Sequence, residues 1–205
     1  MKLGKHPVVV VAHPDDEALF CAGLIIRNWS LQWTVICCSI PRRDPIRAWK
    51  FFESCKRLNV RAMLMPVAEV EPHQELIGLQ LLGMLEPYDC LVTHNQWGEY
   101  GHNHHMQVHR YVSEAAGTRP LITFGYRKEG LGEEELKLTE YEQAKKKLVM
   151  QAYDHVLPYE QWEWPKWRAL EHRYYEVEGM DPTIETYDLN EKCQPISEPL
   201  KFCAA

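Results

Sequence analysis

The sequence predicts an α/β protein, a Rossmann-like three-layer sandwich in which helices cover both faces of a mostly parallel sheet. Short β-branched segments alternate with helical patterns through the first two thirds of the chain. Glycine and proline fall mostly at the junctions between these segments. No repeat or Gly/Ser-rich linker divides the 205 residues. We therefore expect a single domain, with an α/β core at 7–155 and a C-terminal extension at 156–205.

Each predicted strand is a short run rich in valine, isoleucine or other apolar residues. The strands are expected at 7–12, 33–40, 61–67, 88–94 and 121–126. Helical periodicity is found at 16–29, 45–58, 74–86, 104–116 and 138–153. An aromatic-rich segment at 159–177 follows, whose rings suit either stacking on a sugar or a core or oligomer contact. Beyond about residue 180 we expect an extended tail rich in proline and acids.

Composition excludes several classes of protein. The formal net charge is −6 and no basic block is present, so a nucleic acid is not an expected partner. The KKK run at 145–147 is interpreted as a solvated helix face. No apolar run suits a membrane span and no secretory signal is found, so we expect a soluble cytoplasmic protein. The seven cysteines are odd in number and form no CxxC, and we interpret them as reduced core residues.

The acidic motif HPDDE at 13–17 directly follows the first predicted strand. In open α/β sheets, ligands bind beyond the carboxyl ends of the strands. One alternative is that Asp15 caps a helix while Asp16 and Glu17 favour the positive end of its dipole. That alternative does not account for His13, which precedes the acids. No GxGxxG follows the strand, so a dinucleotide is not the expected ligand.

A histidine-rich motif, THNQWGEYGHNHHMQVHRY, follows the fourth predicted strand at 93–111. It contains five of the ten histidines of the chain and ends at the same edge of the sheet as HPDDE. We therefore predict a metal site between the two motifs. Catalytic zinc sites combine three His, Asp or Glu ligands with an open position for water. His13 and Asp16 can supply two ligands, and a histidine of the second motif completes the set.

Spacing suggests how these residues share the chemistry. His102 and His105, three residues apart at a helix start, can face the same cavity. His105 and His109, four apart, are another option, although we interpret His109 as a helix-face residue or as an outer partner of a ligand. One of the adjacent aspartates, Asp15 and Asp16, can bind the metal while the other takes a proton from the metal-bound water. His102 suits stabilisation of the oxyanion and protonation of the leaving group. The set is typical of metal-assisted hydrolysis of a carbonyl-type bond.

Together, AHPDDE after a strand and GHNHHMQVH at 101–109 resemble the PIG-L/LmbE-like zinc N-deacetylases. The resemblance extends to RAWKFFESCKRLNV and EPYDCLVTHN, and covers most of residues 7 to 155. It implies that His13, Asp16 and His105 are the zinc ligands. It also implies that Asp15 is the general base and that His102 is the histidine that stabilises the oxyanion and acts as the acid.

The resemblance further implies a substrate class. This sequence also departs from the family's motifs at two places. We expect removal of an acetyl group from a small N-acetylated amino sugar, with Zn²⁺ or another divalent metal such as Fe²⁺. Arg47 and Glu99 are the candidates for substrate binding, although Arg47 also suits a surface salt bridge. Asn103 and His104 replace the proline and aspartate of the family's H-P-D-H, and Glu99 is a candidate to supply the missing charge. The family's R-x-x-E spacing is also not kept here, because Glu53 lies six residues after Arg47 and not three.

Three other interpretations of the function stay open. A non-catalytic metal-binding or ligand-binding module on the same fold would have no need of Asp15, the second carboxylate. A hydrolase of a non-sugar amide fits the same residues. A two-metal phosphoesterase usually needs more carboxylate ligands than these two motifs offer. A homo-oligomer is compatible with the sequence.

Overall fold

The computed structural model describes residues 3–39, 45–65, 80–81, 83–125 and 136–153, and the strand 175–178. Their strands form one sheet in the order β3-β2-β1-β4-β5-β6. The parallel strands are β1 (Pro7–Val11), β2 (Thr34–Cys37), β3 (Arg61–Leu64), β4 (Cys90–Thr93) and β5 (Leu121–Phe124). The last strand, β6 (Tyr175–Glu178), pairs antiparallel with β5. The predicted α/β class with a mostly parallel sheet is confirmed, whereas β6 was not predicted.

Helices follow the strands at four of the predicted places, and α4 was not predicted. They are η1 (Glu17–Cys21, a π-helix), α1 (Ala22–Arg27), α2 (Pro45–Leu58), α4 (Gly98–Gly101), α5 (Asn103–Ala116), α6 (Glu140–Met150) and η2 (Gln151–Tyr153). The bounds of α2 coincide with the prediction. Most of the predicted helix 74–86, and all of the aromatic-rich segment except its last three residues, lie outside the described residues.

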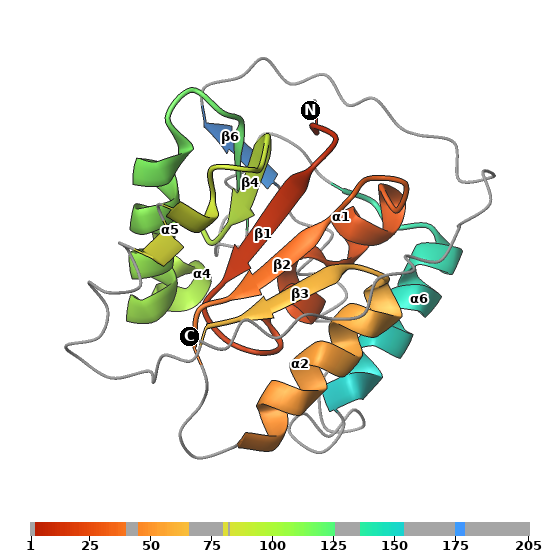
Figure 1. Cartoon of the computed structure of the whole chain (residues 1–205). Coiled ribbons are helices and arrows are strands. Elements are labelled where there is room, and N and C mark those ends of the chain that lie inside the picture. The colour runs from red at the N-terminus through yellow and green to blue at the C-terminus, as the bar shows by residue number, and fades with distance from the viewer. Residues whose placement is uncertain are drawn as a thin grey trace.

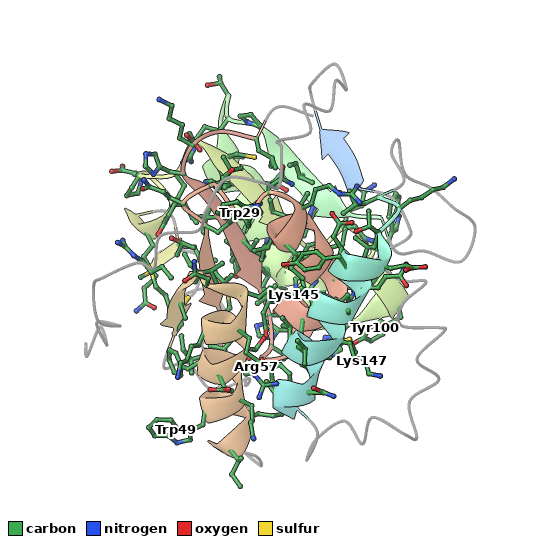
Figure 2. The ribbon with its side chains drawn as sticks, turned by 90° about the vertical axis from the view of Figure 1, so that its right-hand side faces the viewer. Trp29, Trp49, Arg57, Tyr100, Lys145 and Lys147 are labelled. Atoms are coloured by element: carbon green, nitrogen blue, oxygen red, sulfur yellow. The ribbon has the colours of Figure 1, made fainter. Side chains whose placement is uncertain are left out.

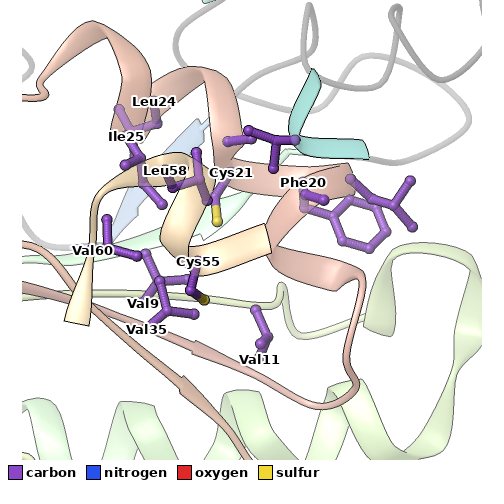
Figure 3. Packing of buried hydrophobic residues seen from close by; sticks show 14 of the residues in the cluster. Val9, Val11, Phe20, Cys21, Leu24, Ile25, Val35, Cys55, Leu58 and Val60 are labelled. Carbon is purple, nitrogen blue, oxygen red and sulfur yellow. The ribbon is translucent and has the colours of Figure 1, made fainter. Parts of the chain in front are cut away.

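The helices form two layers on opposite faces of the sheet (Figure 1). Strand β1 shows why, because its side chains alternate between the faces. Val9 and Val11 belong to the core cluster beneath α1, α2 and α6, part of which is drawn in Figure 3. Val8 and Val10 belong to the second cluster, which contains residues of α5. All four valines are fully buried, as expected for a central strand covered on both faces.

The strand order reverses direction between β1 and β4, which is the place where such sheets bind ligands. The pairing of these strands ends at Val10 and Thr93. Beyond it, the Thr93 hydroxyl donates to the Val10 carbonyl (2.9 Å) and the Ala12 N–H donates to His94 Nε2 (3.0 Å). Two side chains therefore take over the hydrogen bonding where the strand pairing stops. Both sequence motifs begin at this point.

The lysine run at 145–147 is only partly a solvated face. Lys145 and Lys147 are exposed on α6 (Figure 2), but Lys146 is only 1% exposed. Its ammonium donates to the Leu19 carbonyl of η1 (2.8 Å), and burial lowers the pKa of Lys146 to about 7. The prediction was therefore wrong for Lys146, because the helix period places this one position against η1.

Two predictions from composition can be compared with the described residues. Five cysteines are buried free thiols, as expected of core residues: Cys21, Cys37, Cys38, Cys55 and Cys90. The remaining two lie outside the described part of the chain. Among the described helices, none has the length and apolar character needed to cross a membrane.

Candidate metal centre and catalytic residues

The first loop, residues 12–17, connects β1 to η1. Asp16 stands at the N-cap of η1, yet its side chain makes no capping hydrogen bond to the helix. Its Oδ2 instead accepts from the backbone N–H of His13 (2.8 Å). Helix capping therefore does not account for this carboxylate. Burial would raise the pKa of Asp16, but His105, His13 and His94 outweigh burial and hold the pKa well below its usual value.

Three side-chain atoms from the two motifs converge at the switch point. His13 Nδ1 lies 3.2 Å from His105 Nε2 and 3.5 Å from Asp16 Oδ2, and His105 Nε2 lies 3.5 Å from the same oxygen. All three side chains are buried. Two ligands of one tetrahedral zinc ion lie roughly 3.4 Å apart, given metal–ligand distances near 2.1 Å. The spacing and the donor types therefore fit a single divalent ion.

Two neighbouring histidines give the geometry alternatives. His13, His102 and His105 can hold an ion, and so can Asp16, His94 and His105. The second set is disfavoured because His94 Nε2 already accepts the Ala12 N–H, which occupies its lone pair. In the first set, His102 is only half-buried. Its Nδ1 accepts from the backbone N–H of His104 (3.3 Å), so the proton of the neutral ring is on Nε2.

Asp15 lies beside the candidate ligand residues in an unusual backbone conformation. Its φ is 114°, a region that side-chain-bearing residues rarely adopt, and such strain is common at functional sites. Burial, followed by the neighbouring Asp16, raises the pKa of Asp15 to about 8. The guanidinium of Arg47, on α2, lies 2.5 Å from Asp15 Oδ2 and opposes that rise. Arg47 thus forms a salt bridge, but its partner is Asp15 in the candidate site and not a surface residue.

A buried hydrogen-bond network lies beneath Asp15. Glu17 is fully buried and its Oε1 accepts from the Ser54 hydroxyl (2.5 Å) and the Tyr153 hydroxyl (2.6 Å). Its Oε2 accepts from the backbone N–H of Asp15 (3.1 Å). Burial raises the pKa of Glu17 to about 7, and these donors oppose the rise. The sequence analysis missed Ser54 and Tyr153, because nothing local marks either residue as a partner of HPDDE.

The second loop, residues 94–105, is organised around Glu99. This carboxylate is 3% exposed, and its Oε2 lies 2.8 Å from His94 Nδ1 and 2.6 Å from His105 Nδ1. Its Oε1 accepts from the backbone N–H of Asn95 (2.9 Å), and Asn95 Oδ1 accepts from the backbone N–H of Glu99 (3.1 Å). Burial would raise the pKa of Glu99, but the two histidines hold it below its usual value.

Three further side chains complete the surroundings. His104 Nδ1 lies 3.1 Å from His13 Nε2. His109 is buried, and its Nδ1 donates to the His94 carbonyl (2.8 Å), so it contacts a neighbour of the candidate ligands. The exposed ring of Tyr100, labelled in Figure 2, lies 5.9 Å from the His102 ring and 5.5 Å from the His105 ring. The sequence analysis did not single out Tyr100.

Comparison with known proteins identifies the family. The model of the PIG-L family, described as GlcNAc-PI de-N-acetylase, matches residues 8–116, which is more than half of the chain. The chain belongs to the PIG-L family. The matched range contains every residue that we singled out for the metal, the general base and the acid.

Solved structures share the fold of this PIG-L protein at low sequence identity. The N,N'-diacetylchitobiose deacetylase of Pyrococcus horikoshii is 15% identical with a TM-score of 0.68, over 84% of this chain and 83% of that one. The A40926 pseudoaglycone deacetylase is 15% identical with a TM-score of 0.66, over 84% and 95%. The 4-carboxy-2-hydroxymuconate hydratase of Pseudomonas putida is 13% identical with a TM-score of 0.69, over 90% and 100%. The shared fold thus accompanies more than one reaction.

Proposed function

We propose that this protein is a metal-dependent hydrolase that removes the acetyl group from an N-acetylglucosamine-type amino sugar or one of its conjugates. The observation that carries the proposal is the convergence of His13 Nδ1, Asp16 Oδ2 and His105 Nε2 beside Asp15 in a PIG-L chain. Two imidazoles and a carboxylate suit Zn²⁺, and also Fe²⁺. A divalent ion held there would supply a Lewis acid and lower the pKa of a water molecule.

Asp15 is assigned as the general base. Its carboxylate is adjacent in sequence to the proposed ligand Asp16, and the Glu17 network fixes its backbone. Arg47 favours the charged form of Asp15, which is the form able to accept a proton from the attacking water. We propose that this contact with Asp15 is one role of Arg47, in addition to any contact with substrate.

His102 is assigned as the group that stabilises the oxyanion and protonates the leaving amine. Because its Nδ1 accepts the His104 N–H, the ring carries its proton on Nε2. Partial exposure leaves this side chain accessible to a substrate, unlike the buried His105. A positioned imidazole of this kind typically contributes about 10²–10⁴-fold to the rate.

Glu99 takes a role different from the two expected for it. Its carboxylate points at His94 and His105, and burial leaves little of it for a substrate to reach. Ligand histidines usually donate their second ring N–H to a carboxylate, carbonyl or water, which fixes the orientation of the ring. We propose that Glu99 holds His105 in this way.

Free-amine release from a panel of N-acetylated amino sugars tests the proposal. The panel contains N-acetylglucosamine, N,N'-diacetylchitobiose and conjugates of N-acetylglucosamine. The metal-loaded protein is compared with Asp15→Asn after equal metal content has been verified. We expect turnover by the wild type and a loss of about 10²–10⁴-fold in the variant. Equal, negligible release by both proteins would reject the amino-sugar assignment.

Addition of water to a double bond is a second candidate reaction, favoured by the structural similarity to the muconate hydratase. The same panel is therefore extended with an unsaturated dicarboxylate, whose loss of ultraviolet absorbance reports hydration. Activity on this compound without amine release would replace the first assignment. We also propose a cytoplasmic location, because buried free thiols suit a reducing compartment.

A further inference from the structure

We propose that His104 is a positioning residue for the metal ligand His13, through a hydrogen bond in which an imidazole fills the place usually taken by a carboxylate or a carbonyl. The inference rests on the metal site of the proposed function and goes beyond it, because the outer partner of His13 was not part of that assignment. The observation is the 3.1 Å separation of His104 Nδ1 and His13 Nε2.

The direction of this hydrogen bond follows from the ring atoms. His13 Nδ1 faces Asp16 Oδ2 and His105 Nε2, so Nδ1 is the nitrogen that would bind the ion. A ligand nitrogen must carry a free lone pair, and the neutral ring then has its proton on Nε2. His13 Nε2 is therefore the donor and His104 Nδ1 is the acceptor. The ring planes are inclined at 70°, which suits an edge-on approach.

His104 is well placed for such a role. Its ring is 5% exposed and it stands in the first turn of the 14-residue helix α5. Its backbone N–H donates to His102 Nδ1, which ties the start of this helix to the proposed acid histidine. A short rigid segment thus presents an imidazole to His13 and a backbone donor to His102. Each contact fixes the ring orientation of one histidine of the site.

The two ligand histidines consequently have unlike outer partners. His105 faces the carboxylate of Glu99 at 2.6 Å, whereas His13 faces an imidazole. A carboxylate makes the donor ring a stronger ligand by drawing its proton, and an uncharged imidazole does so less. We expect His13 to be the weaker of the two ligands, and its affinity for the ion to be adjustable at position 104.

Metal affinity measured by competition with a chelator tests the inference without reference to activity. We expect His104→Ala to weaken zinc binding by about 10–100-fold. His104→Asn places an amide oxygen near the position of the lost Nδ1 and should restore most of the affinity. His104→Asp should bind at least as tightly as the wild type. His6→Ala, which removes an exposed imidazole at the N-terminus, is the matched control and should bind like the wild type.

Nitrogen-15 NMR of the histidine rings supplies a second readout that a loss of packing would not reproduce. In the wild type, His13 should carry its proton on Nε2 and bind through Nδ1. In His104→Ala, the His13 ring should no longer carry its proton on Nε2 alone. Equal affinities of His104→Ala and His104→Asn, or binding of the wild type through His13 Nε2, would overturn the inference. Failure of the wild type to bind zinc at all would instead reject the proposed metal site.

Discussion

The two loops that meet at the site are stabilised in opposite ways. In the first loop, Glu17 depends on partners that are distant in sequence, with Ser54 37 positions away and Tyr153 136 positions away. In the second loop, Glu99 bonds to His94, Asn95 and His105, all within six positions. Both networks are centred on a buried carboxylate.

The difference shows where each half of the site obtains its geometry. Each loop contains a residue other than glycine with positive φ, Asp15 at 114° and Glu99 at 59°. Such conformations persist only where the surroundings hold them. The second loop carries its own support, whereas the first loop is held by α2 and η2. We therefore expect Asp15, the proposed general base, to be sensitive to substitutions far from the motif that contains it.

The largest effect is expected from Glu99→Ala, which removes the support of the second loop. His94 and His105 would lose their buried carboxylate partner, a change that typically costs about 3–5 kcal/mol. Zinc affinity should fall by about 10–100-fold, because His105 is no longer oriented. Chemical denaturation and chelator competition measure the two effects. An unchanged zinc affinity in a folded variant would show that the second loop does not depend on Glu99.

A smaller and more selective effect is expected from Tyr153→Phe, which tests the distant support of the first loop. Loss of one donor to a buried carboxylate should lower the free energy of unfolding by about 1–3 kcal/mol. Because Glu17 holds the backbone of Asp15 and no proposed ligand, kcat should fall while zinc affinity stays the same. Ser54→Ala is the matched variant on the same oxygen. A fall in zinc affinity equal to that in kcat would contradict this separation.

The last effect is confined to the pH dependence of stability and concerns Lys146, whose ammonium reaches η1 from 127 positions away. The folded protein releases this proton near pH 7, whereas the unfolded chain keeps it to about pH 10.5. Between these values the unfolded state binds more protons, so this lysine makes stability rise with pH, by at most about 1.4 kcal/mol per pH unit. Denaturation of the wild type and Lys146→Met across pH 7–10 measures the difference. Lys147→Ala, at an exposed position, should keep the wild-type slope.

The sequence predicted features that depend on local pattern. The valine run of β1 marks a buried central strand, and the period of α2 predicted its bounds. The two motifs could be placed together because parallel strands end at one edge of the sheet. His13, Asp16 and His105, the ligand set that the family resemblance implies, lie within 3.5 Å of one another, and their binding of a metal stays a prediction.

What the sequence could not predict depends on contacts between distant segments. Ser54 and Tyr153 are ordinary helix residues until the fold brings them to Glu17. In the sequence, nothing distinguishes Lys146 from Lys145 and Lys147. Its burial follows only from the packing of α6 on η1. The sequence pattern also does not distinguish the π-helix η1 from an α-helix. Nor does it distinguish the antiparallel strand β6 from an unpaired extended segment.

The hydrogen bonds at the ends of β1 and β4 have a consequence for engineering the candidate site. The place where strand pairing ends normally leaves backbone amides without partners, each of which costs free energy when buried. Here Thr93 and His94 supply the missing partners, so the strand pairing stops beside the candidate site while the Val10 carbonyl and the Ala12 N–H keep hydrogen bonds. Variants made to change substrate preference should therefore leave these two positions intact and alter exposed residues near the candidate site, such as Tyr100, instead.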